Sequence, residues 1–301
     1  MFRDLDLVLR SAAALLPQRF GYAFTRRVSG AGGAARRREI AKIVERSALE
    51  LLHDPELARA AGAGFVGSIA CDDLDALTAV LWSERRRVRG LVVEGSDAIP
   101  PNGPAVFVSF HLGGGFRVFD VLRRAGLRPT FLCAPPRPAW SRYQRTIAAA
   151  RLRHLERTLE PPFVFTGEGA RANLERHLGS GGSVVALLDV APASVTLHDV
   201  VETELFARRL VLPIGLLRLA VASRAAVVAY QGRIENGRRV LRFHRAARVD
   251  SPIELLGELV PLFERMIGER PADWQAWLEI DALYARPGEA PAVAAGRTRA
   301  G

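Results

Sequence analysis

The segment VFVSFHLGGGFR, residues 106–117, is the part of the sequence that most directly predicts the fold. Its apolar half predicts a buried strand over 105–110, and its three glycines precede a helix that we expect over 116–126. His111 stands between the two, at the carboxyl end of the strand. Ligands bind at the carboxyl ends of strands in open α/β sheets, so this segment predicts both a fold class and a candidate site.

The residue types at this strand end suit proton transfer and the binding of negative charge. A histidine can remove a proton from a hydroxyl group, and backbone N–H groups can stabilise an oxyanion. We therefore expect His111 to act as a general base and the amides of Gly113, Gly114 and Gly115 to bind substrate. The alternative is a histidine bonded to a loop carbonyl, with glycines that serve only the turn.

Segments typical of strands and helices alternate along the chain, which predicts an α/β fold with a mostly parallel central sheet wrapped by helices. The strands are expected over 91–94, 105–110, 130–133, 163–165, 184–188, 226–230 and 240–246. The helices are expected over 116–126, 140–159, 168–178, 209–223, 252–268 and 271–285. This α/β domain would span 91–286. Residues 287–301, rich in Pro, Ala, Gly and Arg, are expected to be a disordered tail.

Residues 1–90 are expected to form a helical N-terminal flank. Apolar residues within 2–24 recur at spacings of three and four, which is typical of an amphipathic helix. That helix would either pack on the body of the protein or lie in a membrane interface. In the second arrangement, four arginines would lie near lipid phosphates: Arg10, Arg19, Arg26 and Arg27.

Two further helices are expected in this flank. One covers 36–53, and the other runs from Asp72 and Asp73, its caps, through 74–81 to the basic run over 85–89. Between them, residues 62–67 fit the glycine pattern of dinucleotide-binding loops but lack a strand before them. We therefore expect a turn between helices at this point.

The composition is that of a globular protein with a basic surface. Of 301 residues, 49% are hydrophobic and 25% are charged, and the formal net charge is +10, which suits an anionic partner. Two cysteines, Cys71 and Cys133, cannot build a disulfide framework. The six histidines show no metal-ligand spacing, so we expect no metal and no other cofactor. The basic runs are scattered and lack interleaved aromatic residues, so nucleic acid is not an expected partner.

No segment has the length and polarity expected of a transmembrane span. The longest apolar stretch, 211–230, is interrupted by Arg218 and Arg224. Two arginines within a spanning helix would be costly. We therefore predict either a cytosolic protein or one that binds a membrane from one side.

Four segments, taken in order, make the chain similar to a known family over roughly residues 5–285. They are FHLG at 110–113, GSVVALLD at 182–189, ELFA at 204–207 with the LPIGLLRLA and AAVV that follow at 212–220 and 225–228, and RPADWQAW at 270–277. On these motifs the chain resembles the lysophospholipid acyltransferase superfamily, in its bacterial lipid A biosynthesis (lauroyl/myristoyl) acyltransferase branch.

The resemblance implies a fold, a reaction and a location. The fold would be glycerolipid acyltransferase-like, and no metal or cofactor would be needed. The reaction would move a fatty acyl chain from acyl carrier protein, or from acyl-CoA, to a hydroxyl or amine of a lipid or glycolipid acceptor. The protein would bind the anionic cytoplasmic face of the bacterial inner membrane peripherally. Phe206, in the counterpart of the family's Phe-Phe-Gly segment, would contact substrate.

The sequence departs from the family where a carboxylate should support the histidine. In the family this acid stands five residues after the histidine, whereas this chain has Phe116 there, followed by Arg117. We expect Asp189, at the end of a neighbouring strand, to orient the histidine, and both Phe116 and Arg117 to bind substrate. Asp120 lies one helical turn further on and is expected to be too far for a direct bond. The alternative is a catalytically degenerate family member that binds lipid or acyl carrier protein and assists an active partner.

Overall fold

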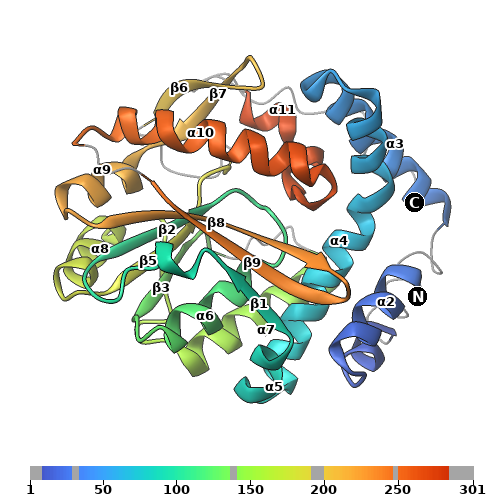
Figure 1. Cartoon of the computed structure of the whole chain (residues 1–301), viewed down its shortest axis with the longest axis horizontal. Helices are drawn as coiled ribbons and strands as arrows, with labels where there is room; N and C mark the ends of the chain where they lie inside the picture. Colours follow the sequence, from blue (N-terminus) through green and yellow to red (C-terminus); the bar gives the residue numbers. More distant parts are fainter. Residues whose placement is uncertain (1–8, 29–33, 136–140, 191–199, 247–249, 285–301) are drawn as a thin grey trace.

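The centre of the protein is a seven-stranded, mostly parallel β-sheet (Figure 1). This computed structural model describes residues 9–28, 34–135, 141–190, 200–246 and 250–284. In spatial order the strands are β1 (Leu91–Glu94), β9 (Arg238–Arg245), β8 (Ala226–Glu235), β2 (Ala105–Ser109), β5 (Ser183–Leu187), β3 (Pro129–Cys133) and β4 (Phe163–Phe165). The predicted α/β class with helices flanking a mostly parallel sheet is confirmed.

Strand β2 occupies the middle of this sheet. It runs parallel to β8 on one side and β5 on the other, and Val106 pairs with Val227 and Val184. All five residues of β2 are buried. The antiparallel pair is β8 and β9, which form a hairpin that turns between Glu235 and Arg238. Residues that follow β2 therefore emerge at the centre of the carboxyl edge of the sheet.

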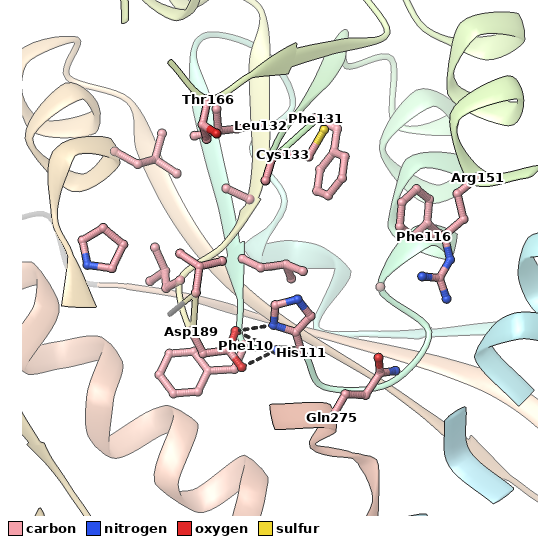
Figure 2. A pocket seen from close by; sticks show the side chains of 18 of the residues that line it. Phe110, His111, Phe116, Phe131, Leu132, Cys133, Arg151, Thr166, Asp189 and Gln275 are labelled. Carbon is pink, nitrogen blue, oxygen red and sulfur yellow. Dashed lines mark hydrogen bonds and ion pairs between the residues drawn. The ribbon is translucent and has the colours of Figure 1, made fainter. Parts of the chain in front are cut away.

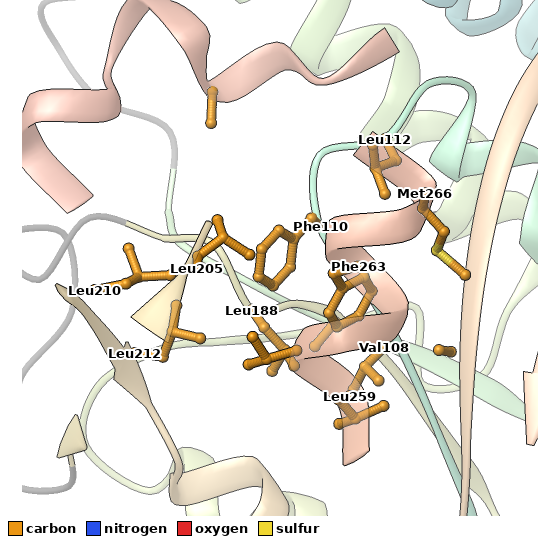
Figure 3. Packing of buried hydrophobic residues seen from close by; sticks show 14 of the residues in the cluster. Val108, Phe110, Leu112, Leu188, Leu205, Leu210, Leu212, Leu259, Phe263 and Met266 are labelled. Atoms are coloured by element: carbon orange, nitrogen blue, oxygen red, sulfur yellow. The ribbon is translucent and has the colours of Figure 1, made fainter. Parts of the chain in front are cut away.

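Side chains that alternate along β2 pack into two separate cores. Val106, Val108 and Phe110 belong to the core covered by α8 (Ala170–Gly179), α9 (Gly215–Ala222) and α10 (Pro252–Glu269). Figure 3 shows this core, in which Phe110 stacks on Phe263 with ring centroids 4.2 Å apart.

The second core lies on the opposite face of the sheet. Ala105 and Phe107 pack there with residues of α6 (Val118–Arg124) and α7 (Arg142–Thr158). The helix expected over 116–126 begins with a short 3₁₀ turn, η2 (Gly115–Arg117), and continues as α6. Another 3₁₀ turn, η1 (Ser96–Ala98), follows β1.

The N-terminal flank contributes α2 (Gln18–Val28), α3 (Ala34–Leu52), α4 (Pro55–Leu81) and α5 (Glu84–Arg89), which lie at one end of the sheet (Figure 1). The predicted turn at 62–67 is wrong, because α4 runs without a break through these residues. A Cβ on Gly62 would lie 2.6 Å from the carbonyl oxygen of Ala41. The glycine is therefore needed for the close approach of α3 to α4.

Asp72 and Asp73 do not cap a helix, which corrects the second prediction for this region. They lie in the middle of α4 and are buried. The cap at the start of α4 is Asp54, whose carboxylate accepts from the backbone N–H groups of Glu56 and Leu57 at 2.8 and 3.0 Å.

The single amphipathic helix expected over 2–24 is wrong for its described part. Residues 1–8 lie outside the described residues, and the chain turns at 14–17 before α2 begins. Ala13 and Ala14 are buried, whereas the large apolar side chains nearby are exposed: Leu15, Leu16 and Phe20. The tail expected over 287–301 also lies outside the described residues. Within the described part of the chain, every helix is too short or too polar to cross a membrane.

The helix expected over 209–223 is wrong in its first half. Residues there form a two-stranded hairpin, β6 (Val200–Leu205) with β7 (Arg208–Pro213), and only α9 is helical. Phe206 and Ala207 make the turn with positive φ angles, which lets β7 pair with β6 before a helix can start.

The helix expected over 271–285 is replaced by three short elements, η4 (Pro271–Asp273), η5 (Gln275–Leu278) and α11 (Ile280–Leu283). A regular helix is interrupted because Trp274 forms an antiparallel bridge with Leu112, beside the loop that follows β2. The C-terminal segment thus packs directly against the candidate site.

Candidate functional site

The imidazole of His111 lies against the carboxylate of Asp189 at the carboxyl edge of the sheet (Figure 2). His111 follows β2 and Asp189 follows the adjacent β5, so strand pairing joins residues 78 positions apart. His111 Nδ1 lies 2.9 Å from Asp189 Oδ1, and the backbone N–H of His111 donates to both carboxylate oxygens at 2.9 and 2.8 Å. The carboxylate is 0% exposed, whereas the imidazole is 36% exposed.

Trp274 completes the hydrogen bonding of this carboxylate. Its indole Nε1 donates to Asp189 Oδ2 at 2.8 Å, and the next backbone N–H, of Gln275, donates to the carbonyl oxygen of His111 at 2.8 Å. Because the Asp189 carboxylate accepts from all its partners, the Nδ1 atom of His111 carries the ring proton. The Nε2 atom then keeps its lone pair and points away from Asp189 (Figure 2).

The surroundings of His111 raise its pKa above the ordinary value. Desolvation lowers the pKa of His111, but the charge and hydrogen bond of Asp189 raise it by more, and Glu279 adds to the increase. Arg151 acts in the opposite direction. The imidazole is therefore a stronger proton acceptor than a free histidine, as a general base at this place requires.

Beside the imidazole is a largely apolar pocket of about 890 Å³. This volume is within the range of pockets that hold small molecules. The apolar wall comes from several elements of the sheet and its helices: Phe131, Leu132, Ala148, Leu152, Leu174, Leu216 and Leu219. The pocket can thus surround an apolar group whose polar end meets His111.

The glycine run shapes the loop between β2 and η2 by close packing. Gly113 and Gly114 have φ angles of 27° and 65°, which non-glycine residues rarely adopt. A Cβ on Gly113 would lie 2.8 Å from the carbonyl oxygen of Gly232, and one on Gly114 would lie 2.5 Å from the guanidinium carbon of Arg239. Any side chain at these two positions would displace the loop.

The expectation that all three glycine amides face a ligand is wrong. Gly113 N–H donates to the carbonyl oxygen of Asp273 at 3.0 Å, and Gly114 N–H donates to Asp72 Oδ1 at 2.7 Å. Among the described residues, Gly115 N–H has no hydrogen-bond acceptor, and Gly115 lines the pocket. Of the three amides, that of Gly115 is the candidate oxyanion donor.

Phe116 lines the pocket, at the position where the family resemblance leads one to expect an acid. Its ring centroid lies 5.8 Å from that of Phe119 and 5.3 Å from that of Phe131. The guanidinium carbon of Arg151, from α7, lies 5.3 Å from the Phe116 ring centroid (Figure 2). Phe116 therefore forms an aromatic wall of the site.

Arg117 does not line the pocket, which corrects the prediction that it binds substrate. Its side chain is buried and forms ion pairs with Asp75 at 3.1 Å and with Asp120 at 3.4 Å. Asp120 also binds Arg87 at 2.7 Å, so this acid is engaged by arginines rather than by His111. The charge of Arg117 is balanced within the fold.

Phe206 is also absent from the pocket lining, contrary to the expectation that it contacts substrate. It occupies the turn of the β6–β7 hairpin with a φ of 51°, and its backbone N–H donates to the carboxylate of Glu264 in α10. Its ring packs at the margin of the larger core.

Sequence reasoning missed several polar residues that line the pocket, among them Arg151, Gln275 and Glu279. Gln275 stands in the RPADWQAW segment, but its loop conformation brings it beside His111, and its amide donates to Asp72. Arg151 lies on a helix with five arginines, and no pattern distinguishes it from the others. The signal available for Gln275 was the motif alone.

A buried ion-pair network underlies the glycine loop. The carboxylates come from Asp72 and Asp75 of α4, and they bind Arg239 of β9 at 2.8 and 2.7 Å. Asp75 accepts from the hydroxyl of Tyr22 in α2 at 2.5 Å. Burial raises the pKa of Asp72 to about 6, against the opposing charge of Arg239. The N-terminal helices thus supply the negative charges on which the loop rests.

No family model matches the sequence, and the comparison with curated proteins found no match either. Among the described residues, no group of three or more His, Cys, Asp or Glu side chains is placed to hold a metal ion.

Proposed function

We propose that the protein is an acyltransferase in which His111 is the general base and Asp189 orients it. The observation that carries the proposal is the His111–Asp189 pair, in which a buried carboxylate holds the Nδ1 proton and leaves Nε2 facing an apolar pocket. The α/β sheet with its site at the carboxyl edge is compatible with the glycerolipid acyltransferase-like fold that the sequence motifs imply.

The reaction that fits this arrangement is transfer of a fatty acyl group from a thioester. His111 Nε2 removes the proton of an acceptor hydroxyl or amine, and the acceptor atom attacks the thioester carbonyl carbon. The resulting oxyanion is stabilised by Gly115 N–H. When the C–S bond breaks, the proton on Nε2 passes to the leaving sulfur, so that an ester or amide and a free thiol are formed.

The pocket supports a long-chain acyl group as the transferred unit. Its wall is aliphatic and aromatic on both sides of the sheet edge, and it reaches from Phe131 to Leu216 and Leu219 of α9. Burying apolar surface contributes roughly 0.8 kcal/mol for each CH₂ group. The donor is acyl carrier protein or acyl-CoA, and the acceptor is a lipid or glycolipid.

A peripheral position on a membrane follows from the same proposal. The N-terminal segment exposes Leu15, Leu16 and Phe20, which could enter the interface of an anionic bilayer. The guanidinium of Arg86 donates to the carbonyl oxygens of Leu15 and Leu16, so a positive charge stands next to these side chains. Arg10, expected near lipid phosphates, is instead buried against Asp73 at 2.5 Å.

A catalytically degenerate protein is the second candidate, and two observations favour it. Phe116 stands at the family's acid position, and the amides of Gly113 and Gly114 are occupied. Such a protein would bind lipid or acyl carrier protein in the same pocket and assist an active partner without transferring the chain.

One assay separates the two candidates. The protein is offered acyl carrier protein loaded with a radiolabelled dodecanoyl chain, together with a bacterial lipid extract. We expect labelled lipid from the wild type and none from His111→Ala. The variant should bind the donor with the same affinity as the wild type. No transfer by the wild type, with the donor still bound, would favour the degenerate protein.

A further inference from the structure

The helix that carries Arg151 into the pocket also exposes an unusually basic surface. α7 contains five arginines and one acid, Glu156. Arg142, Arg145 and Arg153 are exposed, and we name them together the α7 basic face. At 3.6 residues per turn they project within about 80° of one another, and they extend over about 16 Å of the helix axis.

These three charges have only the exposed Glu156 of the same helix beside them, three residues after Arg153, and are less compensated than most arginines around the site. Arg87, Arg117 and Arg239 are buried in ion pairs with aspartates. Among the residues that the structure describes, no carboxylate forms an ion pair with a member of the α7 basic face. The face is therefore a local excess of positive charge, available to an anionic partner.

The other sides of α7 fix where this face stands. Ala148, Arg151 and Leu152 line the pocket, whereas Ile147 and Leu155 are buried. One rigid helix thus joins the wall of the pocket to the basic surface. A partner bound to that surface would be held next to the pocket without blocking its interior.

We propose that the α7 basic face is the docking surface of an acidic acyl carrier protein, which delivers its acyl chain to the adjacent pocket. This inference rests on the proposed function, which names such a donor. Complementary charge across an interface speeds association and fixes orientation. A carrier protein needs this kind of contact, because it must bind, transfer its chain and leave.

A protein suits this face better than a membrane does. Interfacial helices insert large apolar side chains between lipids. None of the exposed large apolar side chains among the described residues lies on α7, whereas Leu15, Leu16 and Phe20 stand on the N-terminal segment. The solvent side of α7 offers guanidinium groups, the single carboxylate of Glu156 and the small side chains of Thr146 and Ala149. Such a surface can pair with carboxylates but gains little from lipid chains.

The test reverses the charge of this face in a triple variant with Arg142→Glu, Arg145→Glu and Arg153→Glu. A control triple variant, with Arg36→Glu and Arg38→Glu in α3 and Arg59→Glu in α4, makes the same change of net charge at exposed arginines of other helices. Binding of dodecanoyl-loaded acyl carrier protein is measured by fluorescence anisotropy, and folding by circular dichroism.

We expect the Kd of the α7 variant for the carrier to rise at least tenfold at low salt and the control to change by less than about threefold. High salt should weaken wild-type binding and reduce the difference. A triple Arg→Lys variant of the α7 basic face should keep most of the affinity. An equal loss in both charge-reversed variants would overturn the inference, because only net charge would then matter. Lost binding to anionic vesicles with intact carrier binding would overturn it in favour of a membrane contact.

A second donor separates this inference from the proposed function. Dodecanoyl-pantetheine has the thioester but no protein surface. If it supports transfer and the wild type does not bind the carrier, the docking inference is wrong and the acyltransferase stands. If neither donor supports transfer but the carrier binds through α7, the docking surface stands and the acyltransferase is wrong.

Discussion

Replacement of Asp189 by Asn should abolish most of the activity while leaving the fold almost unchanged. The side chain keeps its shape, but one carboxylate oxygen becomes an NH₂ group. Trp274 Nε1 and the backbone N–H of His111 can only donate, so the amide oxygen should take the place of Oδ2, which accepts from both. The NH₂ group would then face His111 Nδ1.

This orientation decides the magnitude of the effect. With a donor opposite Nδ1, the imidazole should adopt the tautomer with its proton on Nε2, which then cannot accept one from an acceptor hydroxyl. The backbone N–H of His111 keeps its bond to the amide oxygen and loses the one to Oδ1, so the free energy of unfolding should fall by about 1–2 kcal/mol. The rate should fall by about 10³- to 10⁴-fold, equal to roughly 4–5.5 kcal/mol of lost transition-state stabilisation.

Three measurements test this reasoning. Transfer of a radiolabelled acyl chain gives the rate, urea unfolding gives the stability, and ¹⁵N NMR of the imidazole shows which nitrogen is protonated. Asp97→Asn, at an exposed position in η1, is the matched control and should change none of them. A rate within threefold of the wild type, or a proton that stays on Nδ1 of His111, would refute the role given to Asp189.

Three further outcomes follow from the structure. Because the general base must be neutral and the pKa of His111 is raised, kcat/KM should increase with pH, with a midpoint above the ordinary histidine pKa of about 6.5. A pH–rate profile with a midpoint below that value would contradict this. Gly232→Ala would place a Cβ on the carbonyl oxygen of Gly113 and should lower the free energy of unfolding by about 1–3 kcal/mol. The control Gly257→Ala has open space around its Cβ and should not lower it. Similar urea midpoints for the two variants would argue against close packing at the loop. Burial and nearby arginines lower the pKa of His154 to about 4. The unfolded state therefore binds more protons than the folded state between pH 6.5 and 4, and the free energy of unfolding should fall by about 2 kcal/mol as the pH is lowered across that range. An equal loss in His154→Gln would exclude this histidine as the cause.

The sheet could be predicted from the sequence because its strands are short apolar runs between turn residues. The boundaries of β1 and β4 are those expected, β2 ends one residue early, and β5 begins and ends one residue early. Local signals failed where distant contacts decide the structure. α4 continues through a glycine pattern because α3 packs against Gly62, and a buried run of aspartates in its middle is stable because Arg239 and Arg117 reach it.

Part of the candidate site could also be predicted from the sequence, and part of it depends on distant contacts. Topology alone brought His111 and Asp189 together, because both follow adjacent parallel strands and such ends share one edge. The sequence could not show that the amides of Gly113 and Gly114 are occupied, since Asp72 and Asp273 come from elements far along the chain. Nor could it show that Arg151 alone among the α7 arginines lines the pocket.

The ion pairs beneath the glycine loop have a consequence for how the chain can be divided. Arg117 and Arg239 belong to the sheet region, yet their partners Asp72 and Asp75 come from α4. A fragment beginning at residue 91 would leave Arg239 without its two aspartate partners and Arg117 with Asp120 alone. Removing a partner from such a buried pair costs about 3–5 kcal/mol. The N-terminal helices are thus a built-in counterion for the sheet. We expect fragments 1–90 and 91–301 to be unstable alone and to regain structure when mixed.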